Sequence, residues 1–126
     1  MNWGGYLTLA EGLAANRLEA SDRSAVSRAY YAAFNVSRRW LEANVTQIDN
    51  RGSHGQVWQA FKAANRATPA TREAWVLVGS LGNSLRVLRN QADYDDIVPD
   101  LGGRVTVALR DAERILRLLP ELRFAD

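Results

Sequence analysis

The residues best suited to chemistry lie together near position 90 of the chain. Arg89 and Asp93 are four positions apart, which places them on one face of a helix, and Arg86 lies one turn before Arg89. Asn90 and Tyr94 lie beside them. Guanidinium groups bind phosphate and carboxylate, so this cluster could bind the phosphate of a nucleotide or of RNA. An exposed ion pair between Arg89 and Asp93 is the plain structural alternative.

The composition excludes several other kinds of site. The chain has 126 residues, no cysteine and a single histidine, His54. Disulfides, thiolate metal ligands and thiol catalysis are therefore excluded, and one histidine is too few for a conventional zinc site. The sequence has no glycine-rich phosphate loop, and nothing in it places a serine beside His54 for triad catalysis. We therefore expect no metal and no cofactor.

The kind of basic residue is more informative than the formal charge, which is +2. Fifteen of the sixteen basic residues are arginine, the planar bidentate donor that suits phosphate, although a general arginine preference of the genome would have the same effect. No segment approaches the roughly 18 apolar residues of a membrane span, and the first residues do not resemble a signal peptide. We expect a cytoplasmic protein with no membrane partner.

Apolar periodicity predicts the helices that position the cluster. No stretch alternates with period two, and no linker separates two cores. We predict a single all-α domain over residues 1–126, an up-and-down four-helix bundle plus one short helix. The predicted helices cover about residues 3–18, 22–44, 54–64, 69–95 and 105–119.

Local signals place the starts of three of these helices. Ser21 or Asp22 is the predicted cap of the second helix, Ser53 caps the short helix, and Thr68 with Pro69 starts the long helix that carries the arginines.

The helix faces divide into core and surface. Gly79 and Gly82 inside the long helix predict close packing or a bend, and Tyr30 and Phe34 are expected in the core. A solvated polar face is expected on the second helix at Arg28, Asn35 and Arg38.

Three segments together resemble the HEPN superfamily, in particular its small stand-alone bacterial and archaeal members. They are SRAYYAAF at 27–34, SHGQV at 53–57 and RNQADYD at 89–95. The resemblance implies a bundle of four helices plus a short one, often a homodimer in which the conserved helices face each other. Active members are metal-independent endoribonucleases, many of them toxins or defence proteins, and they are frequently encoded beside a nucleotidyltransferase partner.

The family motif is an arginine followed, after four to six residues, by a histidine. Arg89 matches the arginine, whereas Tyr94 occupies the histidine position at the shortest spacing. RNA cleavage would use Arg89 as the cation that stabilises the phosphorane, with Asp93, Tyr94 or His54 as the base. Histidine has the most suitable ordinary pKa, but His54 lies on another helix. The predicted phosphate ligands are Arg28, Arg86, Arg89 and Asn90.

Two function classes remain open at this point. The first is an endoribonuclease of a toxin–antitoxin or defence system. The second is an inactive HEPN module that dimerises and binds a nucleotide, RNA or a nucleotidyltransferase, which could modify Tyr94. Structural roles are the further alternative, with Tyr94 packed against the last helix and His54 as a capping or surface residue.

Overall fold

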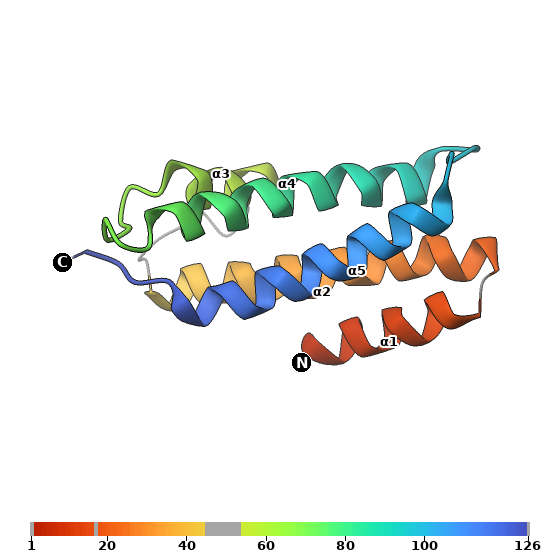
Figure 1. The fold of residues 1–126 in the computed structure, drawn as a ribbon, viewed down its shortest axis with the longest axis horizontal. Helices are drawn as coiled ribbons and strands as arrows, with labels where there is room; N and C mark the ends of the chain where they lie inside the picture. Colours follow the sequence, from red (N-terminus) through yellow and green to blue (C-terminus); the bar gives the residue numbers. More distant parts are fainter. Residues whose placement is uncertain (1, 17, 45–53, 126) are drawn as a thin grey trace.

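Five α-helices make up most of the chain, and they pack as a bundle in the computed structural model (Figure 1). The structure describes residues 2–16, 18–44 and 54–125. No β-strand forms within these ranges, which confirms the all-α prediction. The helices are α1 (Gly4–Ala15), α2 (Glu19–Asn44), α3 (His54–Ala63), α4 (Arg72–Tyr94) and α5 (Leu101–Leu118), followed by the 3-10 turn η1 (Leu119–Glu121).

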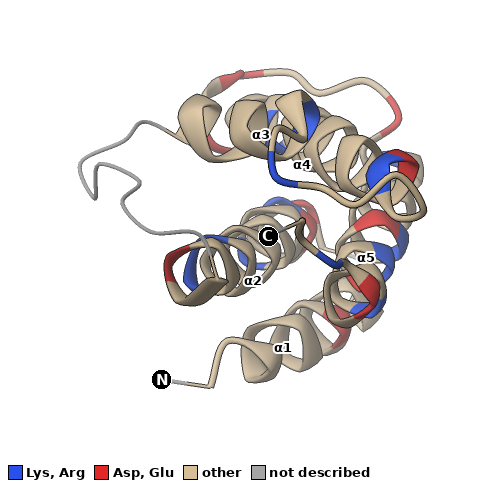
Figure 2. Ribbon diagram, turned by 90° about the vertical axis from the view of Figure 1, so that its left-hand side faces the viewer, with Lys and Arg blue, Asp and Glu red and all other residues tan. Residues whose placement is uncertain are grey.

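Helix α2 is the centre of the arrangement, since it packs against α1, α4 and α5 and touches α3. In Figure 1, α3 and α4 lie on one side of α2 and α5, and α1 lies on the other. Helices α1, α2, α4 and α5 alternate in direction along the chain, which confirms the up-and-down prediction. Figure 2 shows charged segments along α2, α4 and α5, whereas α1 is almost free of them.

Aromatic side chains fill the core between these helices. Trp58, Trp75, Tyr30 and Phe61 are fully buried, as predicted for Tyr30, and Phe34 is buried beside them. Rings from α2, α3 and α4 contact one another here, because large aromatic surfaces gain most from leaving water. This core fixes α3 against α2 and α4.

The two glycines of α4 mark close packing rather than a bend. A Cβ atom on Gly82 would lie 2.1 Å from the ring of Trp58, and one on Gly79 would lie 2.6 Å from the carbonyl oxygen of Trp58. Helix α3 therefore sits directly on the α4 backbone at this point. The predicted close approach is confirmed.

Two helix starts differ from the prediction. Helix α2 begins at Glu19, so Ser21 and Asp22 lie inside its first turn. The negative charge of Asp22 stabilises the helix there, because the helix N-terminus carries a partial positive charge. Helix α4 begins at Arg72, because Thr68 and Thr71 close a turn of their own through backbone and hydroxyl hydrogen bonds of 3.1 and 2.7 Å. Ser53 lies outside the described residues.

One helix end and one further helix start also differ from the prediction. Helix α1 ends at Ala15, before the predicted position. Helix α5 begins earlier than predicted, at Leu101, because the Asp100 side chain accepts a hydrogen bond from the Gly103 backbone.

Candidate functional site

Arg89 is held in place by contacts with three side chains. Its Nη2 donates a hydrogen bond of 2.5 Å to the hydroxyl oxygen of Tyr31, and its Nη1 donates one of 2.9 Å to Asn90. Its Nε lies 2.9 Å from the Asp93 carboxylate, close enough for an ion pair although the angle is wrong for a hydrogen bond. The Arg89 side chain is only 16% exposed, so its charge has a fixed position.

Two tyrosine rings flank this guanidinium group. Its central carbon lies 5.0 Å from the Tyr31 ring centroid and 5.7 Å from that of Tyr94. Both distances are within the range of cation–π attraction. Tyr94 is 72% exposed, so the alternative in which it packs against the last helix is wrong. The predicted cluster of Arg89, Asn90, Asp93 and Tyr94 therefore does form at the end of α4.

His54 belongs to a hydrogen-bonded chain with Tyr30 and Trp58. Trp58 Nε1 donates to the Tyr30 hydroxyl oxygen at 3.1 Å, and the Tyr30 hydroxyl lies 2.8 Å from His54 Nδ1. Two tautomers of neutral His54 fit this contact: either Nδ1 accepts from the Tyr30 hydroxyl and Nε2 carries the proton, or Nδ1–H donates to the Tyr30 oxygen and Nε2 is free to accept a proton. The ring of Phe34 stacks on His54 at 3.9 Å between centroids. His54 is therefore an integrated, half-buried residue and not a free surface histidine.

The charges around His54 are predominantly positive. Burial lowers the pKa of His54 from its ordinary value of 6.5, and nearby guanidinium groups lower it further. These groups belong to Arg89, Arg86 and Arg38. Burial also raises the pKa of Tyr30 to about 12, so Tyr30 keeps its proton at neutral pH. An anion that approached these arginines would reduce the positive potential at His54.

Tyr31 joins the two groups of residues. Its hydroxyl accepts the hydrogen bond from Arg89, and its ring meets the His54 ring edge to face at 5.9 Å. Through Tyr31, the structure thus brings α2, α3 and α4 together at the site. We call this set of Arg89, Tyr31, His54, Asp93 and Tyr94 the Arg89 cluster.

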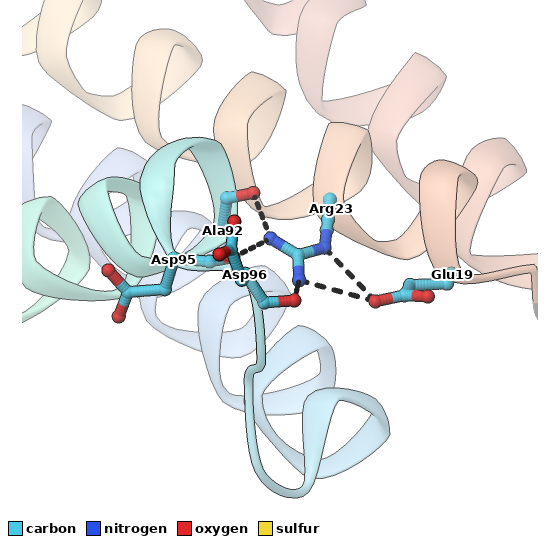
Figure 3. A network of polar contacts seen from close by, with 5 residues as sticks. All are labelled: Glu19, Arg23, Ala92, Asp95 and Asp96. Atoms are coloured by element: carbon cyan, nitrogen blue, oxygen red, sulfur yellow. Dashed lines mark hydrogen bonds and ion pairs between the residues drawn. The ribbon is translucent and has the colours of Figure 1, made fainter.

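Arg23 secures the end of α4 that carries the Arg89 cluster. Its guanidinium donates hydrogen bonds to the carbonyl oxygens of Ala92, Asp95 and Asp96 at 3.0, 2.5 and 2.9 Å, and it also pairs with Glu19 (Figure 3). The last carbonyl groups of a helix have no partners within the helix, so a guanidinium is a suitable cap. The cap fixes Asp93 and Tyr94 relative to α2.

A pocket of about 630 Å³ opens beside the Arg89 cluster. Tyr31 and Asp93 belong to both, since they contact Arg89 and also line the pocket. Helices α1 and α2 and the end of α4 form its walls. The other lining residues are Trp3, Tyr6, Arg23, Ser24, Ser27, Arg28, Asn35 and Ala92.

The polar face predicted on α2 differs from the expectation. Asn35 is 8% exposed, and its amide donates to the Tyr31 carbonyl oxygen at 2.9 Å, so it is not solvated. Arg28 lines the pocket, and its Nε is buried without a hydrogen-bond partner. Arg38 packs over the Phe34 ring at 5.9 Å and lies 3.9 Å from the Glu42 carboxylate. The predicted face is therefore only partly solvated, because Asn35 is buried and Arg28 lines the pocket, whereas the Arg38 side chain is 35% exposed.

Several contributors to the site escaped sequence analysis. Tyr31, Ser27, Trp3 and Arg23 were not predicted as site residues. Ser27 lies 3.5 Å from Asp93, and the two positions are far apart in sequence. A signal was present for Tyr31, since it lies on the polar side of the SRAYYAAF segment next to the buried Tyr30.

Within the described ranges, no three histidine or acidic side chains are grouped so that they could hold a metal ion. Every helix there is too short or too polar to cross a membrane.

Comparison with known proteins gives no relative. No protein-family model matches the chain, and neither a curated protein nor a solved structure matches it significantly. Over the residues that it describes, the structure shows a small all-α protein of five packed helices.

Proposed function

We propose that this protein binds RNA or a nucleotide through its phosphate groups, with Arg28, Arg86, Arg89 and Asn90 as the phosphate-binding residues. One observation carries the proposal: the fixed guanidinium of Arg89 shares Tyr31 and Asp93 with an open pocket that Arg28 also lines. A fixed guanidinium loses little conformational entropy on binding, and phosphate is the anion that best fits its planar fork. The HEPN-like segments of the sequence support the same class of ligand.

If the protein is catalytically active, the proposed activity is that of a metal-independent endoribonuclease. His54, neutral because its pKa is lowered, would accept the proton of a ribose 2′-hydroxyl on Nε2, in the tautomer in which Nδ1–H donates to the Tyr30 oxygen, as the 2′-oxygen attacks the adjacent phosphate. Arg89 would stabilise the negative charge of the phosphorane. In a homodimer of the HEPN kind, two copies of Arg89 would face one shared cleft. A toxin–antitoxin or defence system is the setting in which such a nuclease would act.

Cleavage of single-stranded RNA in EDTA tests this form. We expect cleavage by the wild-type protein, loss of at least about 100-fold in Arg89→Ala, and no loss in the control Arg114→Ala, which changes an exposed arginine of α5. RNA that stays intact with the wild-type protein, or is cut equally by Arg89→Ala, would reject the nuclease form.

A second candidate is a binding module without catalysis. The ion pair between Arg89 and Asp93 favours it, because the carboxylate already neutralises the cation that the phosphorane would need. Tyr94 at the histidine position favours it too. Its exposed hydroxyl is accessible to a partner nucleotidyltransferase, for which it would be the acceptor. In this form the protein shifts the mobility of RNA, or co-purifies with that partner, without cutting RNA.

A further inference from the structure

The part of the pocket wall at the start of α1 is aromatic. Trp3 and Tyr6 both line it, and their rings meet edge to face with 5.0 Å between centroids. Trp3 directly precedes α1 and Tyr6 lies in its first turn, and Glu11 is the only charged residue of that helix. In Figure 2, α1 is correspondingly the least charged helix beside α2. This wall therefore offers ring surface and little charge.

The polar lining residues of the pocket come from α2 and α4. Ser24, Ser27 and Arg28 come from α2, and Asp93 comes from α4. Arg28 forms no ion pair with any carboxylate in the described ranges. Arg23 and Arg89, in contrast, each have an acidic partner. The pocket thus combines aromatic surface with polar side chains, among them an arginine that has no acidic partner in the described ranges.

The size and chemistry of the pocket restrict what it would bind. Its volume of about 630 Å³ lies within the roughly 300–1,000 Å³ of small-ligand sites. A planar ring with hydrogen-bond acceptors on its edge would match both walls. Nucleobases have this chemistry, and they stack on tryptophan and tyrosine when they are not paired with another base.

We propose that Trp3 and Tyr6 form a base-stacking platform, and that the pocket takes one unpaired base of the RNA or nucleotide whose phosphate lies at the Arg89 cluster. This inference rests on the proposed function, because the phosphate site and the pocket share Tyr31 and Asp93. It adds a selection for single-stranded over double-stranded RNA, since a paired base is stacked inside its duplex and cannot enter.

The test compares the affinity of the full chain for a mixed-sequence single-stranded RNA and for its duplex, in EDTA at fixed salt. We expect the wild-type protein to bind the single strand more tightly. Trp3→Leu should weaken single-strand binding by at least about tenfold and leave duplex binding unchanged. Trp3→Phe should retain part of the preference, because it keeps a ring. Leu9→Ala, an exposed change on the same helix, is the control and should match the wild type.

A second measurement uses only the wild-type protein, so it does not depend on whether a variant folds. RNA that contains a photoactivatable base should crosslink within the wild-type chain to Trp3 or Tyr6, as located by mass spectrometry. Equal single-strand affinity in wild type and Trp3→Leu, or crosslinks confined to other helices, would overturn the platform and leave phosphate binding intact. Failure of the wild-type protein to bind any RNA or nucleotide would overturn both the platform and the proposed function.

Discussion

The hydroxyl group of Tyr31 on α2 accepts a hydrogen bond from the Arg89 guanidinium on α4. This contact joins residues that are 58 positions apart, and it places the cation at the edge of the pocket that Tyr31 lines. Asp93 binds the same guanidinium from the other side. Arg89 therefore depends on α2 for its orientation, and the proposed phosphate site is a property of the packed bundle rather than of α4 alone.

Removal of the Tyr31 hydroxyl should release Arg89 from this orientation. In Tyr31→Phe we expect a loss of about 1 kcal/mol in the free energy of unfolding, because a part-buried hydrogen bond to a charged group is lost. We also expect RNA affinity to fall several-fold. Urea titration and fluorescence anisotropy measure the two effects. Tyr94→Phe is the control for stability, because the Tyr94 side chain is mostly exposed, and an equal loss there would contradict this role of Tyr31.

The close contact between α3 and α4 predicts a strong effect at Gly82. In Gly82→Ala the new methyl group would overlap the ring of Trp58, which is fully buried and has no room to move. We expect a loss of about 2–3 kcal/mol in the free energy of unfolding, measured by chemical denaturation.

Gly12→Ala is the matched control, because a Cβ atom there meets nothing within 4 Å. Alanine at this exposed helical position should stabilise the protein by up to about 1 kcal/mol. Equal effects at Gly82 and Gly12 would show that α3 does not sit on the α4 backbone in solution.

Stability should depend on pH through His54. Because its pKa is lowered in the folded protein, the unfolded chain takes up the proton first as pH falls. The stabilisation is complete above about pH 6.5 and is lost progressively as pH falls from 6.5 toward the lowered folded-state pKa. His54→Gln should lack this component, so we compare the thermal midpoints of the two proteins between pH 7.5 and 5. Parallel profiles would contradict the burial of neutral His54.

Much of the fold could be predicted from local sequence patterns. Apolar periodicity predicts the five helices, and the spacing of Arg89 and Asp93 predicts their ion pair. The residues that cap the helices are harder to predict from the sequence. Asp100 caps α5 with a left-handed backbone, φ 50°, a conformation that periodicity does not reveal.

The site depends on contacts that no local pattern predicts. Tyr30 meets His54 across 24 positions, and Arg23 caps α4 across 69 to 73 positions. Asn35 has the polarity of a surface residue, yet the packing of the helices buries it, and the Tyr31 carbonyl oxygen one turn earlier accepts a hydrogen bond from its amide. The distant partners of His54 and Arg23 likewise follow from tertiary packing, which places side chains opposite one another independently of their spacing in the chain.

The most direct test of the central claim measures how strongly single-stranded RNA binds in EDTA at several salt concentrations. Binding should weaken as salt rises, because phosphate contacts release counterions. Arg28→Ala and Arg89→Ala should each weaken binding and reduce the steepness of the salt dependence by about one unit, whereas Arg114→Ala on α5 should not. Equal affinity and equal salt dependence in all four proteins would contradict phosphate binding at the Arg89 cluster.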